Sequence, residues 1–286
     1  MSSQVGCYRA LEVLLSQSQE RLKRFKDKNP ICYLCGRAPT ETIDHFPNRN
    51  CFVRRIGPEG FEFPACLECN QATRQVEQVT SFYAHLMDQN ESRFEDEGEM
   101  LRHVKGIANN FPSLLPDPWV SANEKRAAFR FHNAAYRHST TFADAPIVRL
   151  PDQMPAAFDI FALKMCAALY YRHIGQPISQ SAMIASTWRF FTAKDNDQVL
   201  SPMIEFLPDF ALGKRSNTSI GDQFQYKWGV QEGEPVFAFI ALLRRSFVFV
   251  GAVVPSIDDP SDMHWKPYGQ RFDELWNKSR FWPSES

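Results

Sequence analysis

The sequence predicts a mixed α+β protein with a metal-stabilised module near its N-terminus. Two Cys-x-x-Cys pairs, Cys32–Cys35 and Cys66–Cys69, enclose a stretch that is rich in proline and glycine. Apolar residues recur at helical spacing after the second pair and again over 158–173. After Ser201, β-branched and aromatic residues dominate, which predicts an antiparallel sheet covered by the helix at 158–173.

The bulk composition is that of an ordinary globular protein. The 286 residues are enough for one large domain or two smaller ones, and 44% of them are hydrophobic. The formal net charge is −1, so any contact with a nucleic acid requires a local basic patch. The proline-rich segment 111–118 predicts a boundary between an N-terminal region, 1–118, and a C-terminal α+β region of unknown role, 119–286.

The order of helices and strands is predicted from the spacing of apolar residues and from the prolines and glycines that end regular structure. Helices are expected at 8–28, from the second cysteine pair to about 89, at 91–109, at 123–138 and at 158–173. Strands are expected at 61–65, 224–228, 236–243 and 247–254. The apolar run from Val236 to Val254 is too charged at its centre, Arg244–Arg245, to favour a membrane span, so two strands joined by a tight turn are predicted.

The four paired cysteines predict a structural zinc site, because each Cys-x-x-Cys turn delivers two thiolates to one metal. The alternatives are four unliganded buried thiols or an iron–sulfur cluster, and the spacing favours zinc over both. Cys51 is expected to be a packed free thiol. The absence of an N-terminal signal pattern predicts a reducing, cytoplasmic location with no membrane contact.

A second set of polar residues lies between and just after the cysteine pairs. His45 could accept a proton from water, and Asp44 and Asn70 could offer hard oxygen ligands to Mg²⁺ or Mn²⁺. The alternative is a turn in which His45 bonds a carbonyl, with Asn70 as a helix cap.

The ordered set Cys32-x-x-Cys35, Asp44-His45-Phe46-Pro47 and Ala65-Cys66-x-x-Cys69-Asn70 resembles the HNH endonuclease family, in particular bacterial members with a four-cysteine zinc. The resemblance covers about 31–80. It implies a zinc-stabilised ββα-metal, treble-clef-like module. It also implies His45 as general base, and Asp44 and Asn70 as catalytic residues that ligate a divalent ion.

One element of that family pattern has no counterpart. The middle asparagine, which orients the histidine, is absent from the segment 59–65, and Asn48 and Asn50 are the nearest substitutes.

Taken as a whole, the resemblance implies a metal-dependent endonuclease acting on DNA, in the setting of bacterial defence. The alternative is a catalytically inactive zinc module that binds nucleic acid or a protein partner.

Further side chains near this module could contact a nucleic acid. Arg49, Arg54, Arg55 and Arg74 are the candidate phosphate contacts. Glu77 could be a further ligand, although a solvated helix face or a pair with Arg74 is favoured. The C-terminal region could take a regulatory ligand or protein, and the chain could form a homo-oligomer.

Overall fold

The computed structural model describes residues 18–88, 97–117, 119–126, 148–191, 207, 209–212, 214–215, 218–231, 236–256 and 265–280. The parts of the predicted helices at 8–17, 89–96 and 127–138 lie outside these ranges, as does Cys7. Within them, a helix covers 18–28 and a short one covers 122–126.

The N-terminal module is a β-hairpin followed by a long helix. Strand β1 (Thr42–His45) pairs antiparallel with β2 (Glu62–Ala65), and α2 (Leu67–Leu86) follows at once. The strand at 61–65 and the helix start at the second cysteine pair are thus confirmed. Three short 3-10 helices and one further helix complete this part: η1 (Arg49–Cys51), η2 (Val53–Arg55), η4 (Pro112–Leu114) and α3 (Glu97–Asn110).

The C-terminal part is an antiparallel sheet with helices on it. The six-stranded sheet has the order β10-β3-β9-β8-β7-β4. Its strands are β3 (Met183–Phe190), β4 (Asp209–Leu212), β7 (Phe224–Val230), β8 (Phe237–Leu243), β9 (Phe247–Val254) and β10 (Lys266–Pro267). A separate pair joins β5 (Lys214–Arg215) and β6 (Thr218–Ser219). The helices here are α5 (Met154–Ile174) and α8 (Tyr268–Arg280).

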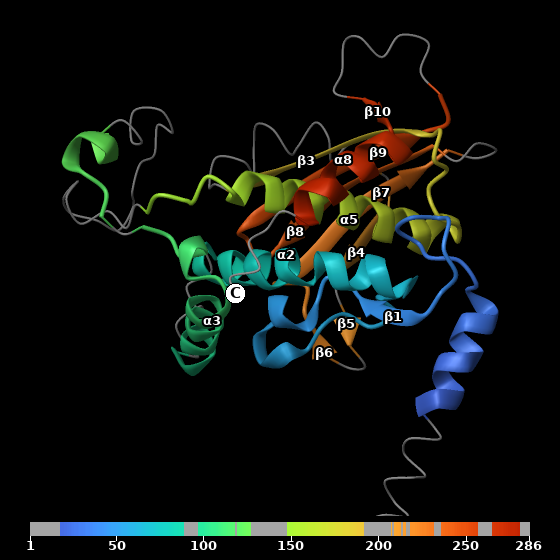
Figure 1. Cartoon of the computed structure of the whole chain (residues 1–286), viewed down its shortest axis with the longest axis horizontal. Helices are drawn as coiled ribbons and strands as arrows, with labels where there is room; N and C mark the ends of the chain where they lie inside the picture. The colour runs from blue at the N-terminus through green and yellow to red at the C-terminus, as the bar shows by residue number, and fades with distance from the viewer. Residues whose placement is uncertain are drawn as a thin grey trace, which may run out of the picture.

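Helix α5 lies between the sheet and the N-terminal module, as Figure 1 shows. Phe46, at the end of the hairpin, packs on Phe161 of α5, with ring centroids 4.7 Å apart. Phe161 in turn packs on Phe249 of β9, at 5.2 Å. One continuous core therefore runs from the cysteines to α8, and the predicted boundary near residue 118 does not separate two cores.

The two apolar runs around Arg244 and Arg245 are strands, as predicted. Both arginines take positive φ, 53° and 46°, in the turn between β8 and β9. Gly175 ends α5 in the left-handed conformation, with φ 80°, and its N–H bonds the Tyr171 carbonyl. Among the helices of the described residues, none is long and apolar enough to cross a membrane.

Gly251 of β9 gives a test of the packing between the sheet and α5. A Cβ at this position would lie 2.5 Å from Phe239 Cε1 and 3.2 Å from Cys166 Sγ. Gly251→Ala should therefore lower the free energy of unfolding by about 1–3 kcal/mol through overpacking. The matched control is Gly106→Ala in α3, where a Cβ meets only Gln78 Nε2 at 3.4 Å. Urea denaturation should show loss at 251 and none at 106.

Candidate functional site

The four predicted cysteines come together. One ligand atom from each of Cys32, Cys35, Cys66 and Cys69 lies within 4.8 Å of the others, and all four are buried, so the cluster could hold a metal ion. Cys51 lies outside the cluster and bonds Ser81 Oγ at 3.1 Å, as expected of a packed free thiol.

In both cysteine turns a backbone N–H group donates to a cysteine sulfur, which would stabilise a thiolate there. The Ala38 N–H donates to Cys35 Sγ, and the Cys69 N–H donates to Cys66 Sγ, each at 3.4 Å. The sulfurs also compete for protons: contact with Cys35 raises the pKa of Cys32 to about 12, and the same contact lowers the pKa of Cys35. A bound cation relieves this competition, because it stabilises all the thiolates together.

Asp44 and His45 are neighbours on β1, so their side chains leave opposite faces of the hairpin. Asp44 points inward and is 4% exposed, whereas the His45 side chain is 38% exposed. This alternation separates the two residues that the resemblance places in one site.

A lysine from α5 holds the inward carboxylate. Lys164 Nζ lies 2.7 Å from Asp44 Oδ2 and 2.9 Å from Thr73 Oγ1, and it also pairs with Glu77 Oε1. The Tyr33 hydroxyl donates to Asp44 Oδ2 at 2.7 Å. The Lys164 ammonium thus lies among oxygen atoms from the hairpin and from α2.

Charge and burial oppose each other in this cluster. Burial acts to lower the pKa of Lys164, but the joint attraction of Asp44 and Glu77 raises it above its ordinary value. Burial raises the pKa of Glu77 in spite of the lysine. Two carboxylates therefore share one ammonium, which remains charged.

The predicted catalytic Mg²⁺ or Mn²⁺ site does not fit these contacts. Asp44 Oδ2 already accepts from Tyr33 and Lys164, so a dication at that oxygen would face an ammonium. Asn70 Nδ2 lies 3.4 Å from Thr42 Oγ1, which leaves its amide turned toward β1 near the hairpin end. The part of the chain described here offers no third His, Cys, Asp or Glu near Asp44 and Glu77 that completes a ligand set.

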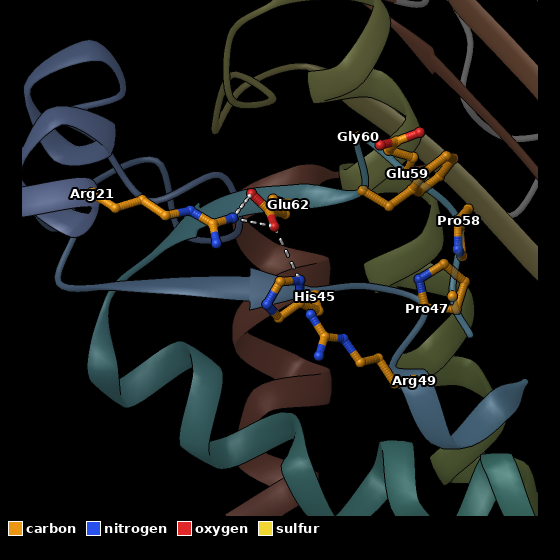
Figure 2. A pocket seen from close by; sticks show the side chains of 10 residues that line it. Arg21, His45, Pro47, Arg49, Pro58, Glu59, Gly60 and Glu62 are labelled. Carbon is orange, nitrogen blue, oxygen red and sulfur yellow. Dashed lines mark hydrogen bonds and ion pairs between the residues drawn. The ribbon is translucent and has the colours of Figure 1, made fainter. Parts of the chain in front are cut away.

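The outward face of the hairpin forms a pocket of about 230 Å³ around His45 (Figure 2). Glu62 lies opposite His45 across the two strands, and its Oε1 is 3.8 Å from His45 Nδ1. Arg21, from the helix at 18–28, makes two hydrogen bonds to Glu62, at 2.6 and 2.8 Å. Arg49 reaches toward His45 from η1.

The pocket keeps His45 neutral. Partial burial lowers the pKa of His45 below its ordinary value, and the positive charge of Arg49 adds to that shift, against a smaller opposing effect of Glu62. A neutral imidazole with a nearby carboxylate at Nδ1 can accept a proton at Nε2. Chemically, the pocket combines a base with two guanidinium groups.

The other residues predicted for the site lie outside the His45 pocket. Arg54 and Arg55 are exposed on η2, and Arg74 is exposed on α2. Asn48 Oδ1 caps η1 and lies 3.0 Å from Ser81 Oγ, which donates to it. The preference for a solvated Glu77, or for a pair with Arg74, is wrong, because Glu77 is buried against Lys164.

Three important side chains of these sites were not predicted from the sequence. Lys164 had a signal, because it is a lone lysine in the middle of a helix whose other central residues are apolar. Glu62 had a weaker one, since a hairpin between 45 and 62 would pair it with His45. Arg21 had none, because only the tertiary fold brings it to Glu62.

Comparison with known proteins gives no match: no family model, curated protein or solved structure is significantly similar to this chain.

Proposed function

We propose that this chain hydrolyses phosphodiester bonds of a nucleic acid at the His45 pocket, and that the substrate is DNA, as the sequence resemblance implies. The observation that carries the proposal is a neutral, accessible histidine in an open pocket with Arg21 and Arg49. Exposed Arg54 and Arg55 continue the positive charge from Arg49 along the same loop.

The reaction follows from the chemistry of these groups. His45 takes a proton from water, and the water oxygen forms a bond to phosphorus as the bond to the leaving oxygen breaks. Arg49, and Arg21 where it is released from Glu62, donate N–H groups to the phosphate oxygens as charge develops on them. The leaving oxygen takes its proton from solvent. No step uses an ion at Asp44.

We further propose that the ion of the cysteine cluster is Zn²⁺. Four thiolates around tetrahedral zinc lie about 3.8 Å from one another, for Zn–S bonds of about 2.3 Å. The cysteine sulfurs, all within 4.8 Å, are close to that arrangement. The ion would fasten the turn at 32–35 to the start of α2 and so fix the hairpin that carries His45.

His45→Ala should fold like the wild type and cleave supercoiled plasmid DNA more slowly by a factor on the order of 10²–10⁴, the usual contribution of a general base. The matched control is His173→Ala, a histidine of α5 that stacks on Trp228. Unchanged cleavage by His45→Ala, or no cleavage by the wild type across metals and substrates, would overturn the proposal.

The pH profile separates a base from a merely structural histidine. The pKa of His45 is lowered, so the active neutral form is complete near pH 7 and is lost as pH falls through that lowered pKa, below about 6.5. Arg49→Ala removes a positive neighbour, which should move this acid limb to higher pH. A structural role of His45 would leave the limb unmoved.

A second candidate function is favoured by the Lys164 contacts. An ammonium held by Asp44 and Glu77 supports a zinc module that has kept binding and lost cleavage. This candidate predicts salt-dependent DNA binding that weakens in Arg49→Ala and persists in Arg37→Ala, since Arg37 pairs with Asp273 of α8. It also predicts no cleavage above the His45→Ala background.

A further inference from the structure

We propose a second metal site, formed by His85 of α2 with Glu99 and His103 of α3, that takes a divalent transition ion such as Zn²⁺. One ligand atom from each of the three residues lies within 4.8 Å of the others. The pairing of two imidazoles with one carboxylate is a common ligand set for such ions and leaves a position for water.

Sequence spacing explains part of this arrangement. Glu99 and His103 are four residues apart in α3, so they lie on one face of that helix. His85 lies in the last turn of α2, and its ring centroid is 4.2 Å from that of His103. The cysteine cluster lies at the start of α2 and His85 lies in its last turn, so the two groups of ligands are separated by most of the length of that helix.

Backbone groups around the three residues make hydrogen bonds that would orient His85 and Glu99 as metal ligands. His85 Nε2 lies 2.9 Å from the Asn50 carbonyl oxygen, so Nε2 carries the proton and Nδ1 keeps its lone pair. Metal-bound histidines usually donate their other ring N–H in this way. The Arg54 backbone N–H donates to both Glu99 oxygens, at 3.1 and 3.3 Å, and so orients that carboxylate.

The protonation states of His85 and His103 also favour binding of a cation. Burial lowers the pKa of His85 to about 3 and that of His103 to about 4, so both rings are neutral at pH 7 and need not lose a proton to bind. Arg244, Arg55 and Arg102 act on these rings with positive charge, which opposes the ion. The Asp88 carboxylate offsets part of this positive charge, because it pairs with Arg244 at 2.9 Å.

A bound ion would have a structural consequence for the basic loop. Asn50 and Arg54, in η1 and η2, are held directly by two of the proposed ligands. Arg54, whose N–H donates to Glu99, also takes a left-handed conformation, with φ 55°. The ion would therefore fix the segment 49–55 against α2 and α3. The proposal is independent of the nuclease function, because it concerns metal content alone.

The test is the zinc content of the full chain after saturation with Zn²⁺ and gel filtration in metal-free buffer. Wild type and His45→Ala should retain two ions per chain, and His103→Ala should retain one. Glu99→Gln keeps an acceptor for the Arg54 N–H but loses the charge, so it too should fall toward one. One ion in the wild type, or two in both variants, would overturn the proposal.

If His103→Ala folds poorly, Co²⁺ absorption spectroscopy provides a second test. Co²⁺ added to protein that already holds zinc at the cysteines should give d–d absorption without thiolate-to-cobalt charge transfer. That signal should be present in wild type and His45→Ala and lost in Glu99→Gln. If no cobalt signal appears in the wild type, or it is equally strong in Glu99→Gln, the three residues form only a polar cluster.

Discussion

Lys164→Met should lower the free energy of unfolding by about 3–5 kcal/mol, the usual cost of removing one partner from a buried ion pair. Methionine fills a similar volume, so the loss reports charge rather than packing. Asp44 and Glu77 would be left buried beside each other without the ammonium that both contact. Thermal denaturation should show a fall in Tm on the order of 10 °C.

Two comparisons separate the ion cluster from general effects of the substitution. Lys266→Met removes a partly exposed pair with Glu274 and should cost less than about 1 kcal/mol. Adding Asp44→Asn and Glu77→Gln to Lys164→Met neutralises the stranded carboxylates and should recover part of the loss. Equal stabilities for Lys164→Met and Lys266→Met would show that the buried pair contributes nothing.

Cys66→Ser should prevent the chain from folding stably. Structural zinc stabilises small zinc-binding peptides by about 10–16 kcal/mol, and whole domains are stable by only about 5–15 kcal/mol. The core that contains Cys66 continues through α5 into the sheet, so both parts should lose their structure together. Separate unfolding of the segment 31–80, with the sheet still folded, would contradict this prediction.

The control for that variant is Cys51→Ser, a buried thiol outside the cluster whose partner Ser81 can bond a hydroxyl equally well. It should keep its zinc and its Tm within a few degrees of the wild type. Near-UV circular dichroism and metal content report tertiary packing and binding separately. A Cys66→Ser protein with full zinc and native near-UV signal would remove Cys66 from the ligand set.

The cluster of four cysteines could be predicted from the sequence because the Cys-x-x-Cys spacing already brings two thiols together in one turn. The strands around Arg244 were predictable for a similar reason, since charge in the middle of an apolar run leaves few other structures. Strand β3 was not, because its burial alternates weakly and its place between β9 and β10 is set by tertiary pairing.

The candidate site was harder to predict than the fold. Asp44 and His45 are adjacent in sequence, yet a strand sends their side chains to opposite faces. The partner of each comes from a distant element: Lys164 from α5 and Glu62 from β2. His85, Glu99 and His103 likewise meet only because α2 packs on α3.

The proposed function requires that Asp44 anchors Lys164 while His45 carries out the chemistry. Its most direct test is the initial rate of plasmid cleavage by Asp44→Asn, at a temperature where circular dichroism shows the variant folded, beside His45→Ala and wild type. We expect Asp44→Asn to be less stable but to cleave within a few-fold of the wild-type rate, and His45→Ala to be almost inactive. A folded Asp44→Asn that is as inactive as His45→Ala would contradict this assignment and return Asp44 to the catalytic centre.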